Sequence, residues 1–470
     1  MNMLASPAAR PIVLAILLLA SLRIPTGAAV LEAGVAEVDI TPPLGHRMAG
    51  YFNERLATGV HDPLHAKTIV LRQGRQRVAL IFCDILGITR EVSTQARARI
   101  HAQTGIPVRN QLIAATHTHT GPLYHDVRRD ALHARAVKKF GYDPAETIYY
   151  PDFLVDQLVR SAVEAHARLA PARLRVGTAH AEGLAFNRRY HMQDGRVVFN
   201  PGVLNPNIVR PAGPVDPEVG LVFVEAADGT ALGSLIVFAC HCDTVGGTEY
   251  SADYPFFLQE TLRAKFGTEF CSAFAAGTCG DINHINVTTR TTARKGEITA
   301  RIGNTLGATA LQVYADAPHV ARPRLAVRHQ VFKVPLQTVT AEQVAAARAR
   351  LDQDGLESGT LLERAENVKA LDLDRRGPTW PVEVQVFRLD RDTALVGLPG
   401  EIFCDLGLAI KRASPFPRTL VMSLCNDRPG YVPTKKAFAE GSYEVLNSRV
   451  QPGGGERLVE SALTLLRQLH

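Results

Sequence analysis

Four short apolar runs in this chain each end abruptly in polar groups that can bind metals or carry protons. Near-continuous apolar strands are typical of a sheet covered on both faces, and such α/β sheets bind ligands at the carboxyl ends of their strands. We therefore expect an α/β fold with mixed sheets and covering helices. The runs are residues 111–115, 234–239, 272–276 and 393–398. The groups that follow them, and that could converge, are His117, His119, His241, Asp281 and Glu401.

The first run leads into two histidines, His117 and His119, before Gly121-Pro122 stops the strand. On extended backbone, the period of two would send both rings to one side. Neutral imidazole is the commonest transition-metal ligand, and two such rings often supply ligands to zinc. The alternative is a pair of histidines hydrogen-bonded to their neighbours. The similar ends of the other three runs favour the metal site.

A series of short motifs runs through most of the chain from about Glu32 onward. Together they resemble the neutral (non-lysosomal) ceramidases, zinc-dependent amidases that split the N-acyl bond of ceramide. The motifs lie at Ala36–Pro43, Gly50-Tyr51, Asp62–Leu64, Asp84, Thr116–Pro122, Asn187-Arg188, Val215–Pro217, His241, Asp253–Pro255, Gly280-Asp281, Pro399–Glu401, Tyr431–Thr434 and Tyr443-Glu444.

The resemblance implies a ceramidase-like catalytic domain with one zinc ion. Its ligands would be His117, His241, Glu401 and Tyr431. The resemblance also implies that His119 and Arg188 contact the substrate or stabilise the transition state. Tyrosine is an unusual zinc ligand, so the alternative for Tyr431 is a hydrogen-bond donor just outside the metal's ligand set.

One position departs from the ceramidases. Their Gly-Asp-x-Ser-Pro-Asn run supplies a serine that acts with the zinc, whereas this chain has Asn283 at that place. An amide cannot be that nucleophile, so metal-activated water would attack directly. Asp281 or His119 would carry the proton, and Arg188 or Asn283 would donate to the oxyanion. Cys279 could in principle replace the serine.

The chain is expected to comprise a signal peptide, residues 1–29, and one catalytic domain, residues 30–470, without a C-terminal β-sandwich domain. Arg10, the apolar run 12–20 and the small residues 27–29 form a leader that predicts export to the periplasm or the medium. A retained anchor is the alternative. No other segment approaches the ~20 apolar residues that a membrane span needs.

The composition indicates a folded enzyme, with 46% hydrophobic and 21% charged residues and a net charge of +6. No basic block marks nucleic-acid binding, and Arg128-Arg129 and Lys138-Lys139 are interpreted as solvated pairs. The seven cysteines lie in or beside apolar runs, which predicts buried thiols rather than disulfides. The sequence does not indicate an oligomeric state.

Local patterns predict the scaffold between these motifs. Thr340–Gln343 is a capping box that begins a helix, expected to pair with a helix over residues 361–369. Residues 382–386 alternate like a half-exposed strand, and Trp380 is expected to pack rather than to stack on a substrate. Glu401 is expected to begin a helix. Residues 183–217 are interpreted as a long irregular loop that forms a substrate wall.

Three hypotheses for function follow. The first is a zinc hydrolase that cleaves an N-acyl or related acyl bond of a small or lipid-like substrate. The second is a metal-dependent lyase, in which Tyr431 or His119 removes the proton beside the carboxylate of a uronate-containing saccharide. The third is a protein that binds metal without catalysis, which is the least favoured because buried ionisable groups are costly to retain without partners.

Overall fold

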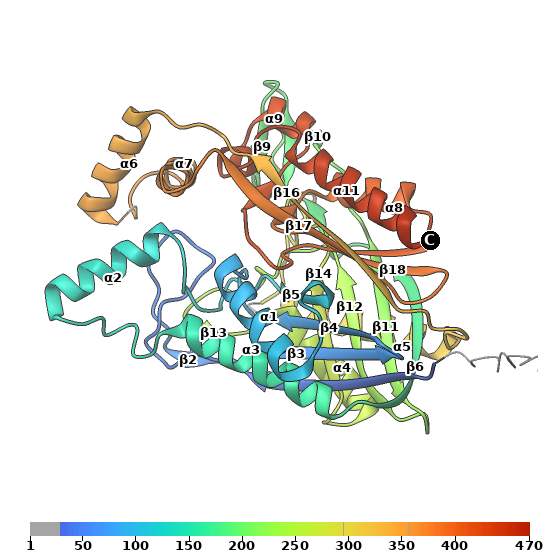
Figure 1. The fold of residues 1–470 in the computed structure, drawn as a ribbon. Helices are drawn as coiled ribbons and strands as arrows, with labels where there is room; N and C mark the ends of the chain where they lie inside the picture. Colours follow the sequence, from blue (N-terminus) through green and yellow to red (C-terminus); the bar gives the residue numbers. More distant parts are fainter. Residues whose placement is uncertain (1–28, 295, 356) are drawn as a thin grey trace, which may run out of the picture.

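The computed structural model describes residues 29–294, 296–355 and 357–470, and these residues form four layers of secondary structure (Figure 1). An eight-stranded sheet carries helices on its outer face and packs its inner face against a four-stranded sheet. Two further helices cover the far face of that second sheet. The expected α/β fold with mixed sheets and covering helices is confirmed. Residues 1–28 of the expected leader lie outside the described part of the chain.

The eight-stranded sheet has the strand order β14-β12-β11-β6-β1-β3-β4-β5. Neighbours pair antiparallel except β4 with β5 and β12 with β14, which are parallel. The strands are β1 (Leu31–Asp39), β3 (His65–Gln73), β4 (Gln76–Cys83), β5 (Gln111–Ala115), β6 (Ala170–His180), β11 (Glu218–Ala226), β12 (Ala231–Phe238) and β14 (Cys271–Ala276). The outer helices are α1 (Arg90–Thr104), α3 (Tyr150–Ala167), α4 (Tyr254–Phe266) and α5 (Glu297–Asp316).

The four-stranded sheet has the order β16-β17-β18-β20, in which only β18 and β20 are parallel. Its inner residues, such as Leu395 and Met422, share a core with Leu112 and Val237 of the larger sheet. The strands are β16 (Ala326–Pro335), β17 (Thr379–Arg388), β18 (Thr393–Gly397) and β20 (Arg418–Met422), covered by α8 (Cys404–Ala413) and α11 (Gly454–Leu469). Burial on both faces explains why the runs in β5, β12, β14 and β18 are mostly apolar.

The carboxyl ends of these strands meet, although β5 and β14 lie at opposite edges of the larger sheet. The sheet is so strongly curved that β14 contacts β5. Beyond the strands, Thr118 bridges to Cys242, and Ala114 bridges to Cys425 of the segment after β20. The convergence expected from the sequence therefore arises from sheet curvature and from the stacking of two sheets.

Short elements connect the longer strands and helices. They are β2 (Gly59–Val60), β13 (Glu249–Tyr250), β15 (Ile282–Asn283), β19 (Glu401–Ile402), β21 (Tyr431–Val432), a 3-10 turn (Val108–Asn110), α9 (Lys435–Glu440) and α10 (Tyr443–Leu446). Glu401 does not begin a helix, contrary to expectation. It lies in β19, paired with Tyr431 in β21, and the helix begins three residues later at Cys404.

The segment 183–217 is not an irregular loop, so that prediction was wrong. It contains β7 (Phe186–Asn187) and a small sheet of β8 (Arg189–Met192), β9 (Val197–Phe199) and β10 (Ile208–Pro211). The pattern was hard to recognise because the strands are two to four residues long and are separated by turns. Strand β17 is also more buried than the alternating pattern predicted, because the larger sheet covers one face and α11 the other.

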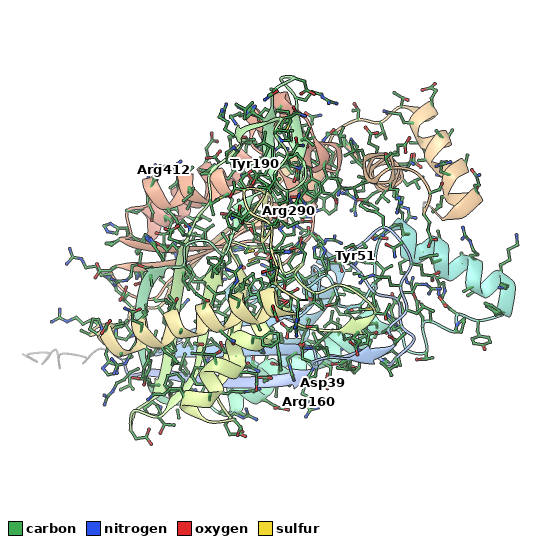
Figure 2. All side chains as sticks on the ribbon, turned by 180° about the vertical axis from the view of Figure 1, so that it is seen from behind. Asp39, Tyr51, Arg160, Tyr190, Arg290 and Arg412 are labelled. Carbon is green, nitrogen blue, oxygen red and sulfur yellow. The ribbon has the colours of Figure 1, made fainter. Side chains whose placement is uncertain are left out.

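Helices α2 (Val127–Phe140), α6 (Ala341–Asp354) and α7 (Leu361–Asp374) project together from one side of the molecule (Figure 1). The predicted capping box at Thr340 is confirmed, α7 begins with a second one at Thr360, and α6 packs on α7. Seen from behind, Tyr51 lies on the same side as these helices (Figure 2). Lys138 and Lys139 are exposed on α2, whereas Arg128 is buried and paired with Asp126, so only the lysine pair is solvated.

All seven cysteines are buried and free, as predicted. Trp380 is also buried and its indole donates to Asp427 at 2.8 Å, but it lines the cavity described below as well, so its packing role stays a prediction. Within the described residues, no helix is both long enough and apolar enough to span a bilayer.

Gly280 provides a test of how the loop after β14 packs on β19. An added Cβ would lie 2.4 Å from the Glu401 carbonyl oxygen, so we expect Gly280→Ala to lower the free energy of unfolding by about 1–3 kcal/mol. Gly377→Ala is the matched control, because a Cβ there meets nothing within 4 Å and its φ is not positive. Urea unfolding monitored by circular dichroism would measure both. Equal stability of the two variants would contradict this packing.

Candidate metal centre and its cavity

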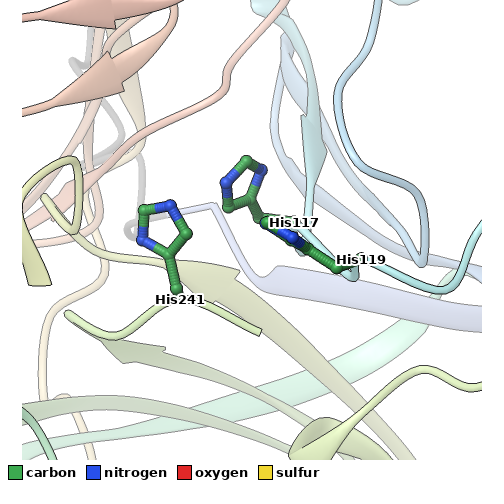
Figure 3. Close-up of side chains that lie close together, drawn as sticks. All are labelled: His117, His119 and His241. Atoms are coloured by element: carbon green, nitrogen blue, oxygen red, sulfur yellow. The ribbon is translucent and has the colours of Figure 1, made fainter. Parts of the chain in front are cut away.

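Three histidines lie together at the junction of the strand ends (Figure 3). His117 and His119 follow β5, and His241 follows β12. The ring centroids of His117 and His241 are 4.5 Å apart, and those of His117 and His119 are 5.1 Å apart. His117 has a φ of 74°, a left-handed conformation that is costly for a residue with a side chain. The tight turn after β5 therefore aims this imidazole into the site at a conformational cost.

Backbone carbonyls fix the orientation of two of these rings. His117 Nδ1 lies 2.7 Å from Leu86 O, and His241 Nδ1 lies 2.8 Å from Cys279 O and 2.9 Å from Ile282 O. Because a carbonyl oxygen only accepts, both Nδ1 atoms must carry the proton and donate it. Each Nε2 is then an acceptor, with its lone pair turned away from the backbone that holds the ring.

Glu401 completes a cluster of acceptors. Its Oε2 lies 3.3 Å from His117 Nε2 and 3.5 Å from His241 Nε2. These three atoms and His119 Nε2 are buried and have no hydrogen-bond partner. Unsatisfied buried polar atoms cost about 1–3 kcal/mol each, and converging lone pairs repel one another. A bound cation would satisfy the Nε2 atoms of His117 and His241 and the Oε2 atom of Glu401, so the residues present fit a zinc ion.

Tyr431 lies beside Glu401 because β19 and β21 pair in parallel register. Arg188 Nη2 donates to the Tyr431 hydroxyl at 3.0 Å. Burial and the Glu401 carboxylate raise the pKa of the Tyr431 phenol well above its ordinary value, while Arg188 opposes that rise. A cation bound at the histidines would, like Arg188, lower the pKa of the Tyr431 phenol. Tyr431 is thus paired with Glu401, and its hydroxyl is held by Arg188.

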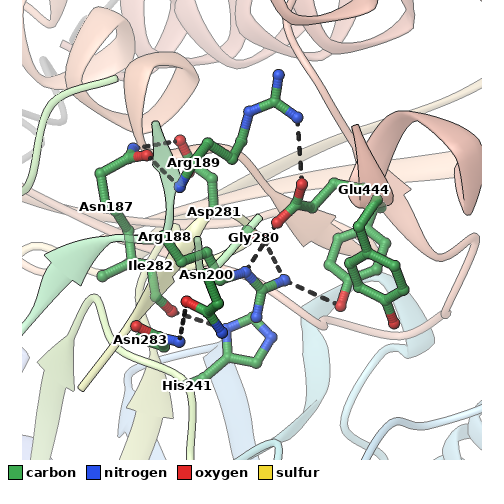
Figure 4. A network of polar contacts seen from close by, with 12 residues as sticks. Asn187, Arg188, Arg189, Asn200, His241, Gly280, Asp281, Ile282, Asn283 and Glu444 are labelled. Carbon is green, nitrogen blue, oxygen red and sulfur yellow. Dashed lines mark hydrogen bonds and ion pairs between the residues drawn. The ribbon is translucent and has the colours of Figure 1, made fainter. Parts of the chain in front are cut away.

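Arg188 belongs to a buried network behind Tyr431 rather than to an exposed substrate wall (Figure 4). Its Nε donates to Glu444 Oε1 at 2.9 Å and its Nη2 to Gly280 O at 2.9 Å. Glu444 also accepts from Arg189 at 3.1 Å. The Arg188 side chain therefore connects Tyr431 to the loop after β14, and its Nε and Nη2 donate to protein atoms.

Asp281 and Asn283 are close to the cluster but are engaged elsewhere (Figure 4). Asp281 accepts from Cys404 N at 2.8 Å and from Asn187 Nδ2 at 2.7 Å, and burial raises its pKa to about 6. Asn283 donates to Asn200 Oδ1 at 3.2 Å and accepts from Ile285 N at 3.1 Å. Both side chains hold loops in place, and neither lines the cavity described below. Cys279 is fully buried, and burial raises the pKa of its thiol, which disfavours a role as nucleophile.

A cavity of about 590 Å³ opens onto the cluster. His117, His119, Glu401 and Tyr431 form its inner wall, whereas the projecting helices α2 and α7 contribute to its lining. The size is within the ordinary range for a small-molecule site. His119 is only partly buried, with its ring against Tyr51 at 5.8 Å between centroids. It is therefore the histidine most open to a bound substrate.

Comparison with known proteins shows what this fold is. The structure resembles the crystal structure of neutral ceramidase from Pseudomonas aeruginosa with a TM-score of 0.70 at 20% identity, covering 94% of this chain and 75% of that one. A ceramidase complexed with C2 gives a TM-score of 0.69. The described fold is thus that of a neutral ceramidase.

The sequence comparisons identify the family. The profile of the neutral/alkaline non-lysosomal ceramidase N-terminal domain matches residues 31–296, so the chain belongs to this family of amide-bond hydrolases. The neutral ceramidase of P. aeruginosa is 24% identical over 87% of this chain and 68% of that protein. The neutral ceramidase of Mycobacterium tuberculosis is 26% identical over 48% of this chain and 38% of its own length. The resemblance stated from the sequence motifs is confirmed.

Two features of the site had not been recognised in the sequence. The carbonyl of Leu86 orients His117, and Glu444 anchors Arg188. A backbone carbonyl leaves no trace in residue identity, so Leu86 could not have been found. Glu444 belonged to the motif Tyr443-Glu444, which carried the resemblance without an assigned role.

Metal content can test the cluster against the second group of ligand-type residues, His133, Asp143 and Glu146. We expect one zinc per chain, lost in the His117→Ala/His241→Ala double variant because two ligands are removed. His133→Ala should retain it, because Arg47 and Arg129 already neutralise Asp143 and Glu146. Plasma emission spectroscopy of the purified proteins would measure this. Stoichiometric zinc in the double variant, or its loss from His133→Ala, would refute the assignment.

Proposed function

We propose that this protein is an exported zinc-dependent hydrolase that cleaves the amide bond of an N-acyl compound. The observation that carries the proposal is the convergence of His117 Nε2, His241 Nε2 and Glu401 Oε2 next to a cavity that His117 and Glu401 line. Family membership supports an amide as the target, and the named relatives are neutral ceramidases. The proposed zinc ligands are these three residues and Tyr431.

Zinc held there would lower the pKa of a water molecule toward neutrality and polarise the scissile carbonyl. The chain's own groups supply the rest. Asn283 has no hydroxyl and its amide is occupied by Asn200 and Ile285, so water is the nucleophile. His119 presents an unpartnered Nε2 and lines the cavity, so we assign it, rather than Asp281, to carry the proton to the leaving nitrogen.

Arg188 acts through Tyr431 in this proposal. Its guanidinium donates to the Tyr431 hydroxyl and is itself fixed by Glu444, so it holds the phenol oxygen in place and favours the phenolate. The donor to the developing oxyanion is then a group of the cavity wall, because neither Arg188 nor Asn283 lines the cavity. Export rests on the sequence of residues 1–29, and a lipid-like or other small N-acyl compound is the proposed substrate.

Release of amine from N-acyl substrates tests the reaction. We expect the zinc-loaded protein to hydrolyse them, a chelator to abolish this, and Asn283→Ser to retain activity within about tenfold, because only hydrogen bonds to neighbouring loops change. Amine-specific fluorescence labelling would follow the product. A loss far greater than tenfold in Asn283→Ser would show that the amide takes part in catalysis. Unsaturated, ultraviolet-absorbing products from uronate oligosaccharides, with no amide hydrolysis, would instead identify a lyase.

Tyr431→Phe tests the fourth ligand. We expect weaker zinc binding together with a loss of about 10–100-fold in turnover, because both a ligand atom and the acceptor of Arg188 disappear. Tyr443→Phe is the matched control, since its ring lies 5.7 Å from that of Tyr431 and also lines the cavity. Competition with a fluorescent chelator would give the zinc affinities. Unchanged zinc affinity in Tyr431→Phe would place the phenol outside the ligand set.

A further inference from the structure

Six arginines line the cavity in front of the candidate metal centre. Five of them form ion pairs with carboxylates that also line the cavity. The pairs are Arg90–Asp427, Arg128–Asp126, Arg375–Asp130, Arg376–Asp372 and Arg449–Asp372, all within 3.2 Å. These ion pairs brace the wall and leave little net charge.

Arg428 is the exception. Among the described residues its guanidinium has no carboxylate partner, and its one side-chain contact is from Nη1 to His125 Nε2 at 2.5 Å. Its Nε is buried without a partner, and Nη2 meets no acceptor in the described part of the chain. Burial and the adjacent Arg428 lower the pKa of His125 to about 3, so this imidazole is neutral and does not balance the charge.

The nearest carboxylates are committed to other groups. Asp427 Oδ2 accepts from Arg90 at 2.9 Å and from Trp380 at 2.8 Å, and its Oδ1 accepts from the backbone N of Arg428. Asp126 caps helix α2 and pairs with Arg128. Glu91 also lines the cavity but is exposed to solvent in the first turn of α1. A partly buried cation thus faces the cavity without a dedicated counter-ion.

The position of Arg428 is tied to the metal centre from two sides. Its stem packs over Gly87, where an added Cβ would lie 2.2 Å from Cδ, and Gly87 follows the Leu86 carbonyl that orients His117. Two residues after Arg428, the Gly430 carbonyl accepts from Glu401 N at 2.9 Å. Arg428 and three of the candidate zinc ligands, His117, Glu401 and Tyr431, therefore line the same cavity.

We propose that Arg428 binds a carboxylate of the substrate, so that the preferred substrates are N-acyl compounds carrying an acid group, such as N-acyl amino acids, rather than neutral ceramide. This substrate class rests on the proposed amide hydrolysis. A guanidinium presents planar donors that match a carboxylate, and such charge-assisted bonds are stronger than neutral ones. Discrimination by one such contact amounts to about tenfold to hundredfold in affinity.

Two ketones that cannot be hydrolysed test carboxylate binding independently of amide hydrolysis. Both are analogues of N-octanoylglycine in which a methylene group replaces the amide N–H. The first, the acid, keeps the carboxylate. The second, the alcohol, has a hydroxymethyl group in place of the carboxylate. We expect the zinc-loaded protein to bind the acid at least about tenfold more tightly than the alcohol, as measured by isothermal titration calorimetry. Equal affinities would overturn the proposal, whether or not the protein hydrolyses amides.

Two variants assign the preference to Arg428. In Arg428→Gln the acid-to-alcohol affinity ratio should fall to near one, and Arg428→Lys should retain part of it. Arg375→Gln, an arginine of the same lining that is paired with Asp130, should leave the ratio unchanged. A ratio preserved in Arg428→Gln with normal zinc content would overturn the assignment. If the protein binds the acid more tightly than the alcohol but hydrolyses no amide, the carboxylate site is supported and the proposed reaction is refuted.

Discussion

The orientation of two imidazoles is the constraint on which the site depends. His117 and His241 each donate Nδ1–H to a backbone carbonyl, which leaves both Nε2 lone pairs facing Glu401 Oε2. Three acceptors at this separation repel one another unless a cation lies between them. The protein accepts a left-handed backbone at His117 and the burial of several unpartnered polar atoms to build this arrangement. Such costs are retained at functional sites.

The fold supplies the rigidity that this arrangement needs. Curvature of the eight-stranded sheet brings the segments that follow β5 and β12 together, and Glu401 and Tyr431 lie on two paired short strands that follow the strands of the second sheet. Gly280 allows the loop after β14 to press against β19, and Arg188 ties this loop to Tyr431. The two histidines follow strands of the larger sheet, whereas Glu401 and Tyr431 follow strands of the smaller one, so the centre forms only when both sheets are assembled.

The sequence alone was sufficient for the buried strands and for the convergence of their ends, because both follow from apolar runs that stop at polar groups. It could not predict what Asp281 and Asn283 do, since their partners Asn187 and Asn200 come from a remote segment. Glu401 was misplaced on a helix because its pairing with a distant strand overrides the local pattern. The role proposed for Arg428 could not be predicted either, because the sequence does not show which arginine lacks an ion-pair partner in the folded protein.

The central claim is that the imidazoles and Glu401 form one metal centre with nitrogen and oxygen ligands. X-ray absorption spectroscopy at the zinc edge, recorded on the purified protein, tests it most directly. Zinc bound by these residues would be surrounded by nitrogen and oxygen atoms at about 2.0–2.1 Å, with the multiple-scattering pattern of imidazole. A sulfur shell at about 2.3 Å would place the metal at Cys240, Cys242 or Cys279 instead and would contradict the account.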